Sequence, residues 1–336
     1  MTIDERKKQG LPEKVWSVLL QLSGNTGVDT AENMAVCRGY SYDLNEQVDE
    51  AIWHDVTGFA AEKGMNMVFI SLGNAIEYAT HPELAVKNAW KPEKLRAELA
   101  RLRSMGITPI PKLNFSSSHD IWLGEYERML STKIYYKVCR EIIHEVIDIF
   151  DNPPLFHLGL DEENAYTPEF LGFQYGCFRQ FDLLYHDMNY LFDCVREKGV
   201  RPMIWFSLGG KHHRDEVLEH IGKDVVLNPY KYDKYVFASH TKYKWNSAYV
   251  PDEIRNEPQK IKDLADAGYD IIICGSTWDT VYNIQQMLEY CEANIPPEKN
   301  LGYMVVPWKL CLPEFEYAAK NDIHLLSHYS SKFGLR

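Results

Sequence analysis

Three consecutive carboxylates, Asp161, Glu162 and Glu163, follow the apolar segment LFHLGL and are the groups of this 336-residue chain best suited to acid–base chemistry. Two neighbouring carboxylates in a partly dry site repel each other, so one of them is pushed towards its protonated form. Such a site keeps an acid and a base side by side at neutral pH. We therefore expect Asp161 and Glu162 to be catalytic. For Glu163 we expect only a favourable position at the start of a helix, where the helix dipole attracts acids.

Further polar and aromatic residues follow other apolar segments of the sequence. Aromatic rings stack on the apolar faces of a ligand, and a few polar groups among apolar ones are usual for a small-molecule site. We expect two of three tryptophans to line such a site, and Tyr230 rather than Tyr232 to contact the ligand. The predicted ligand-binding residues are Asn114, His119, Trp205, Tyr230, Trp278, Asp279 and Trp308. The family resemblance given below is what implies a sugar as their ligand and what singles out Asn114 and Tyr230. Two of the predicted residues have competing interpretations, since Asp279 could instead cap a helix and His119 could orient the acid.

A metal centre is the second interpretation of the same region. His119, His157, Asp161 and Glu162 are ligand types that sugar isomerases and metal hydrolases use. The sequence has neither an H-x-H nor an H-E-x-x-H spacing, so we expect no metal and no other cofactor. A barrel that binds carbohydrate without cleaving it is the third interpretation, because a fold does not determine a function.

Eight short apolar segments are predicted to be strands that are buried on both faces. Helical patterns with one apolar face separate them, for example Leu95, Leu99 and Leu102, and later the longer stripe from Ile134 to Ile149. The predicted strands are Val15–Leu22, Met67–Leu72, Thr108–Leu113, Leu155–Leu160, Pro202–Phe206, Val225–Leu227, Ile271–Cys274 and Tyr303–Val306.

The connections between these elements are of two lengths. Helix-to-strand connections are short and contain a glycine suited to a helix C-terminus, at Gly64, Gly106, Gly199, Gly222 and Gly268. Strand-to-helix connections are long: 23–48, 73–90, 114–130, 161–176 and 228–253. This pattern predicts a single (β/α)₈ TIM barrel over residues 1–336 with its functional loops at one end. An open doubly wound sheet uses the same alternation, but no glycine-rich nucleotide loop follows the first strand.

The composition restricts the partners and the compartment. A net charge of −12 repels the phosphates of nucleic acids and anionic membranes, so neither is an expected partner. The sequence has no run of eighteen apolar residues and no apolar segment at its charged N-terminus. Seven cysteines without a C-x-x-C pair favour a reducing compartment. We expect a cytoplasmic protein as encoded, or a secreted or periplasmic one if a leader was removed; the oligomeric state stays open.

The segment HLGLDEE resembles the His-x-Gly-Gly-Asp-Glu motif of glycoside hydrolase family 20, the β-N-acetylhexosaminidases. Segments 111–119, 225–233 and 302–308 are similar to the family's regions at strands three, six and eight. The resemblance extends from about residue 67 to the end of the chain. It implies that Glu162 protonates the glycosidic oxygen while Asp161 orients the 2-acetamido group of a terminal N-acetylhexosamine. That group, rather than an enzyme side chain, would attack the anomeric carbon.

The sequence also departs from the family's pattern. Ser23–Asn25 stand where the family has an arginine after the first strand. Asn114 replaces the acid of strand three, and Leu310 stands where the family often has an acid. The resemblance therefore describes a divergent member with an altered sugar pocket.

Overall fold

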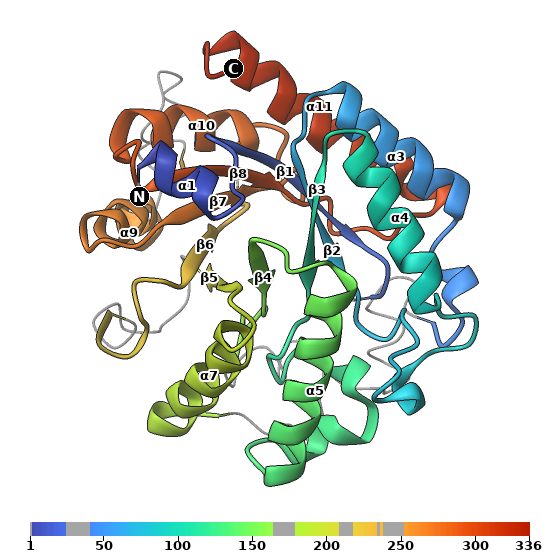
Figure 1. The fold of residues 1–336 in the computed structure, drawn as a ribbon. Coiled ribbons are helices and arrows are strands. Elements are labelled where there is room, and N and C mark those ends of the chain that lie inside the picture. Colours follow the sequence, from blue (N-terminus) through green and yellow to red (C-terminus); the bar gives the residue numbers. More distant parts are fainter. Residues whose placement is uncertain (1, 25–40, 164–178, 208–217, 234–235, 238–251) are drawn as a thin grey trace.

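The structure of the chain is a computed structural model that describes residues 2–24, 41–163, 179–207, 218–233, 236–237 and 252–336 (Figure 1). Eight parallel strands close into a barrel in sequence order, with β1 hydrogen-bonded to both β2 and β8. The strands are β1 (Val15–Gln21), β2 (Met67–Ser71), β3 (Thr108–Lys112), β4 (Leu155–His157), β5 (Arg201–Ser207), β6 (Val226–Tyr230), β7 (Ile271–Gly275) and β8 (Asn300–Val305). The predicted (β/α)₈ barrel is confirmed, and the pairing of β1 with β8 excludes an open sheet.

Helices surround the barrel and cover the outer face of its strands (Figure 1). Those outside the barrel wall are α3 (Glu50–Glu62), α4 (Pro92–Ser104), α5 (Lys133–Ile149), α7 (Phe181–Arg196), α9 (Asp252–Asp266), α10 (Asn283–Asn294) and α11 (Glu316–Lys332). The short α1 (Ile3–Lys8) lies at the amino end of the barrel, where its Arg6 donates to the Asn300 carbonyl at the start of β8. Short 3₁₀ turns lie in the connections: η1 (Leu44–Glu46), η2 (Pro82–Leu84), η3 (Ile121–Met129) and η6 (Pro313–Phe315). None of the helices in the described ranges is both long and apolar enough to cross a membrane.

The side chains of each strand alternate between two apolar layers, as the pleat of a strand requires. Phe69 of β2 belongs to the cluster inside the barrel. Its neighbours Val68 and Ile70 pack outwards with the helices in the larger cluster. The upper end of the inner layer is more polar, because Lys112, His157 and Asn228 are buried there. The strand ends therefore bring polar groups together at the carboxyl side of the barrel.

Three strand ends differ from the prediction by three residues, among them the start of β8 at Asn300 rather than Tyr303, and the other differences are of one residue. β4 ends at His157 rather than Leu160, because Gly159 and Leu160 have φ angles of 72° and 64°, which a strand cannot contain. β6 continues to Tyr230 instead of ending at Leu227. Of the five glycines predicted at helix exits, Gly64, Gly106, Gly199 and Gly268 have a positive φ, whereas Gly222 does not.

Candidate active site

Asp161 and Glu162 lie where the chain leaves β4 at the carboxyl end of the barrel, as predicted. The backbone turns sharply there, and Leu160 and Glu162 both have positive φ angles, of 64° and 56°. Side chains other than glycine rarely adopt this conformation, and such strain clusters at functional sites. Leu160 occupies the place of the second glycine in the motif that this segment resembles, so the conformation typical of glycine is kept without the glycine.

Asn114 holds this turn in place. A Cβ atom at Gly159 would lie 2.1 Å from the Asn114 Oδ1, so only glycine fits there. The Asn114 Oδ1 accepts hydrogen bonds from the backbone N–H groups of Leu160 and Ser116, both at 3.1 Å. Its Nδ2 donates to the Asp161 Oδ1 at 2.7 Å. The side chain that we expected to bind substrate is thus directed towards Asp161 and fixes its orientation.

His119 joins the two acids. Its Nε2 lies 3.3 Å from the Asp161 Oδ2 and 3.1 Å from the Glu162 Oε2. His119 and Asp161 are buried, whereas the Glu162 side chain is 42% exposed. Burial alone would lower the pKa of His119, but the charges and hydrogen bonds of the two acids raise it to about 10. His119 is therefore an imidazolium at neutral pH.

The same imidazolium keeps Asp161 ionised. Burial raises the pKa of an acid, yet the charge and hydrogen bond of His119, the charge of Lys112 and the Asn114 hydrogen bond outweigh burial at Asp161. They hold the pKa of Asp161 well below its usual range. The pair therefore consists of a buried carboxylate, Asp161, and a half-exposed acid beside it, Glu162.

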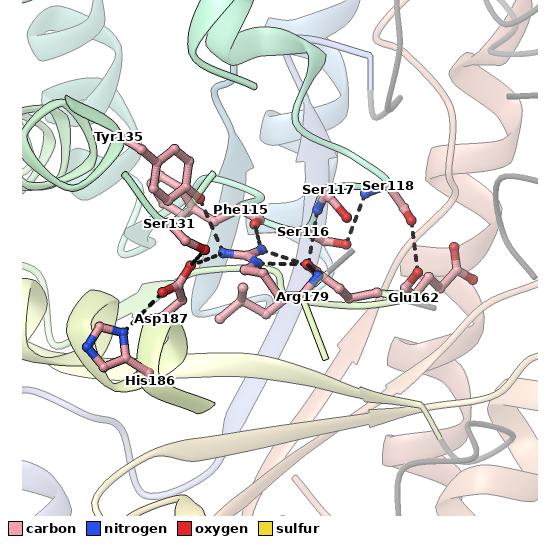
Figure 2. A network of polar contacts seen from close by, with 12 residues as sticks. Phe115, Ser116, Ser117, Ser118, Ser131, Tyr135, Glu162, Arg179, His186 and Asp187 are labelled. Atoms are coloured by element: carbon pink, nitrogen blue, oxygen red, sulfur yellow. Dashed lines mark hydrogen bonds and ion pairs between the residues drawn. The ribbon is translucent and has the colours of Figure 1, made fainter. Parts of the chain in front are cut away.

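Glu163, the third acid, is structural in a way that the sequence did not predict. Its carboxylate receives two hydrogen bonds from the guanidinium of the buried Arg179, at 2.6 and 2.7 Å. Ser117 N–H also donates to it, at 3.1 Å. Arg179 donates in turn to the Phe115 carbonyl at 2.6 Å (Figure 2). Glu163 thus contacts Arg179 and Ser117 rather than Asp161 and Glu162, and it fastens the chain after β4 to the loop after β3.

A second acid completes the surroundings of Arg179. Asp187 on α7 lies 3.5 Å from the Arg179 Nη1 and accepts a hydrogen bond from Ser131 Oγ at 2.7 Å (Figure 2). Tyr136 donates to the other oxygen of Asp187 at 2.5 Å. Residues 164–178 lie outside the described part of the chain, so the helix start that we expected next to Glu163 is not tested.

His157 points into the barrel and uses both ring nitrogens. Its Nδ1 accepts the Gly159 N–H at 3.0 Å, so the proton is on Nε2, which donates to the Asn228 Oδ1 at 3.3 Å. Burial, reinforced by the charge of Lys112, lowers the pKa of His157 to about 3, which keeps the ring neutral. Because both ring nitrogens already have partners, His157 does not join the other three groups of our second interpretation.

The remaining three groups of that interpretation are close together. Ligand atoms of His119, Asp161 and Glu162 lie within 4.8 Å of one another, a separation at which they could surround a cation. A histidine binds metal only in its neutral form, however, and the pKa of His119 is raised to about 10 by its acidic neighbours after burial is overcome. In the protein without a metal, the three groups form an ion-paired triad.

Four aromatic side chains lie close together at the carboxyl side of the barrel: Trp205 in β5, Tyr230 and Tyr232 at and just after the end of β6, and Trp308 after β8. The Trp205 ring lies 4.6 Å from His157, 5.4 Å from Tyr230 and 5.8 Å from Trp308, measured between centroids. Tyr232 contacts Tyr230 and Trp308, at 5.6 and 6.3 Å. Trp205 is 3% exposed and so supports the others from beneath, while Tyr230, Tyr232 and Trp308 are only partly buried.

The two tyrosines differ in what their hydroxyl groups contact. The Tyr232 hydroxyl lies 3.7 Å from the Cys274 sulfur. The Tyr230 hydroxyl is shielded from solvent but has no hydrogen bond of ordinary geometry in the described part of the chain, although Ser207 is near. Burial, and then the charges of Asp161 and Glu162, raise the pKa of Tyr230 well above its usual value. Tyr230, our choice from the sequence, therefore has an uncommitted donor close to the two acids.

Trp278 and Asp279 lie further out, on the loop after β7. Both are exposed, and the ammonium of Lys309 lies over the Trp278 ring, 5.1 Å from its centroid. This loop is fastened from beneath, because Thr277 Oγ1 donates to the buried Asp322 of α11 at 2.5 Å. The structure thus brings Trp205 and Trp308 together but leaves Trp278 at the rim.

The Asp322 anchor gives a pH-dependent stability. Burial raises the pKa of Asp322 from 3.8 to about 7, against the hydrogen bonds from Thr277. The native state thus holds a proton that the unfolded chain releases, and this contribution to stability is lost as the pH rises from about 4 to about 7. We expect the stability of Asp322→Asn, measured relative to the wild type, to be higher at pH 8 than at pH 5. Urea unfolding at both values measures this, and a difference that stays constant contradicts it.

Comparison with known proteins relates the chain to other structures by fold. A scan against protein-family models and a search of curated sequences each give no match. Among solved structures, the GH20 β-N-acetylhexosaminidase from Streptomyces coelicolor A3(2) aligns over 91% of this chain and 63% of its own, with a TM-score of 0.58 and 10% identity. The β-N-acetylhexosaminidase from Bacteroides fragilis NCTC 9343 aligns over 91% and 65%, with a TM-score of 0.57 and 12% identity.

A mutant of the Streptomyces plicatus β-hexosaminidase in complex with its product GlcNAc is similar too, with a TM-score of 0.55, 11% identity, and 95% and 68% of the two chains aligned. This chain spans slightly less than two thirds of the length of the first and second of these three proteins. At such low identity the likeness establishes a shared barrel architecture.

Proposed function

We propose that this chain is a retaining glycoside hydrolase that removes a terminal N-acetylhexosamine, or a related sugar, with help from the 2-acetamido group of its substrate. One observation carries the proposal. Asp161 and Glu162 each place a carboxylate oxygen against the same nitrogen of His119, at 3.3 and 3.1 Å. Because both oxygens reach one atom, no sugar ring can lie between the two acids.

This geometry argues against the two ordinary glycosidase mechanisms. Inverting enzymes separate their carboxyl groups by about 6.5–9.5 Å to admit water, and ordinary retaining enzymes place an acid and a nucleophile on either side of the bond. Two acids on the same side of the sugar suit the recognised exception, in which the substrate supplies its own nucleophile. The adjacent positions of Asp161 and Glu162 are then what the reaction requires.

The roles follow from exposure and charge. The half-exposed Glu162 would give its proton to the glycosidic oxygen as the bond to the anomeric carbon breaks. The acetamide oxygen of the substrate would form the new bond to that carbon, giving a cyclic oxazolinium ion. The ionised Asp161 would accept the acetamide N–H and stabilise the positive charge. Glu162 would then take a proton from a water molecule whose oxygen forms a bond to the anomeric carbon. The bond from that carbon to the acetamide oxygen breaks, which restores the acetamido group and gives net retention of configuration.

The surrounding residues support a sugar in this position. The uncommitted hydroxyl of Tyr230 is a donor suited to the acetamide oxygen. The partly buried Trp308 offers an apolar ring beside it, and the exposed Trp278 and Asp279 would contact the sugar from the rim. The β-N-acetylhexosaminidases that share the fold, one of them with GlcNAc bound, add support to this choice of substrate. The proposed reaction needs neither a metal nor a cofactor.

Hydrolysis of paired aryl glycosides tests the proposal. Each pair has the same sugar configuration and leaving group, with a 2-acetamido group in one member and a 2-hydroxyl in the other. We expect hydrolysis only of the acetamido members. Equal rates within a pair would exclude participation of the substrate. Binding of N-acetylhexosamine without hydrolysis of any pair would support the non-catalytic barrel instead.

A further inference from the structure

Lys112 is a buried cation directly beneath the candidate site. It is the last residue of β3 and is 0% exposed inside the barrel. Its strand neighbours in register are Ser71 on β2 and His157 on β4. Within the described residues its ammonium makes one hydrogen bond, to Ser71 Oγ at 3.5 Å. An ammonium carries three donors, and a buried charge is costly unless another charge or several acceptors compensate it.

Asp161 is the group that compensates Lys112. Asn114 follows Lys112 by two residues, so the two side chains lie on the same face of this segment. The Asn114 amide donates to Asp161 at 2.7 Å, which places Lys112 one layer below that contact. No carboxylate among the described residues lies within the 4 Å of an ion pair, and Asp161 is the acid whose charge acts on Lys112. In a dry interior such an attraction acts over several ångströms.

We propose that Lys112 is a positioning residue of the proposed glycosidase, whose buried ammonium keeps Asp161 ionised from below while His119 does so from above. The inference rests on the proposed function only for its catalytic consequence. His119 divides its contacts between Asp161 and Glu162, whereas Lys112 faces Asp161 without a second acid.

The other groups around this pair do not replace Lys112. His157 is neutral, because burial and the charge of Lys112 lower its pKa to about 3. The Tyr230 hydroxyl, on the far side, is also neutral, since burial raises its pKa well above the usual value. Burial lowers the pKa of Lys112 to about 8 although Asp161 opposes this, so its charge is present at neutral pH and fades above that value.

Removal of this charge has a defined effect. An opposite charge nearby lowers the pKa of an acid, so the loss of the Lys112 charge should raise the pKa of Asp161. A protonated Asp161 could not stabilise the cationic intermediate. The acid limb of the kcat profile should therefore move to higher pH in Lys112→Met, in which a side chain of similar length fills the same space.

The direct test measures Asp161 itself and needs no activity. Protein labelled with ¹³Cγ-aspartate is titrated by NMR as wild type and as Lys112→Met, and Asp161→Asn assigns the signal. We expect the wild-type signal to stay at the carboxylate position down to the pH of acid unfolding, and the variant to titrate above that pH. An Asp161 signal that remains ionised over the same range in both proteins overturns the inference.

A matched control separates charge from stability. Arg6 is another buried cation, but it lies at the opposite end of the barrel, where it donates to the Glu13, Pro297 and Asn300 carbonyls. Arg6→Met should lose stability without moving the Asp161 titration or the kcat profile. Lys112→Gln replaces Lys112→Met if the latter does not fold, and it should show the same shift. If no glycoside is hydrolysed, the proposed function fails while the titration still decides the role of Lys112.

Discussion

Glu162→Gln is expected to hydrolyse a 2-acetamido glycoside at least ~100-fold more slowly than the wild type, which is the usual size of general acid–base catalysis. Glutamine keeps the shape and the contact with His119 but has no proton to give. The loss should depend on the leaving group, because a phenolate with strongly electron-withdrawing substituents departs without protonation. We expect a large loss of kcat with an alkyl or sugar leaving group and a much smaller one with dinitrophenol.

Two further measurements make this result specific. Calorimetry should find that Glu162→Gln binds the sugar with nearly unchanged affinity, because the side chain is half-exposed and the glutamine keeps the contact with His119. Glu93→Gln removes an exposed acid from the first turn of α4 and should keep the wild-type rate. A Glu162→Gln enzyme with the wild-type rate, or with an equal loss for all leaving groups, would rule out the role of general acid.

Arg179→Met should produce a large loss of a different kind, about 3–5 kcal/mol of unfolding free energy, as expected when one partner of a buried ion pair is removed. In the variant the Glu163 carboxylate stays buried beside the loop after β3 and keeps the hydrogen bond from the Ser117 N–H. It loses its two hydrogen bonds from the guanidinium. Asp187 loses its cation as well. Urea unfolding of the variant beside the wild type measures the effect.

The double variant Glu163→Leu/Arg179→Met is the control for this interpretation. It removes both charges and replaces them with apolar groups, so it should be more stable than Arg179→Met alone. If the single variant unfolds at the wild-type urea concentration, the buried pair does not stabilise the loop. The neighbouring acids thus predict opposite phenotypes, with Glu162 required for turnover and Glu163 for stability.

The fold could be predicted because each of its elements carries a local signal. A strand such as Met67–Ser71 is an apolar segment between glycine-containing turns, and its partner strand follows at a regular spacing. The end of β4 could not be placed, because it depends on the backbone conformation of Gly159 and Leu160. That conformation is imposed by Asn114, which lies far away in the sequence.

The candidate site was predicted only as far as residue types and strand ends determine it. The sequence places Asp161, Glu162 and His119 at the same end of the barrel, and the structure brings these three together. The sequence could not show that Asn114 is directed towards Asp161, because an amide side chain can bind many different partners. Trp278 follows a strand just as Trp308 does, yet only packing decides that its ring lies at the rim.

Two important residues, Arg179 and Lys112, were not identified from the sequence. Arg179 follows a segment without periodicity, and its partners Glu163 and Asp187 are identified only by the tertiary fold. Lys112 did leave a signal, since a charged residue ends the strand TPIPK, whose other four residues carry no charge. A lysine at a strand end is usually exposed, so that signal acquires its meaning only when the barrel is closed.

The Glu163–Arg179 contact joins the two positions that flank residues 164–178. A segment whose two ends are pinned can change in length and composition at a modest entropic cost, while the residues outside the pins keep their places. Evolution or a protein engineer could therefore exchange those fifteen residues, and Glu162, one position before the pin, would stay where it is.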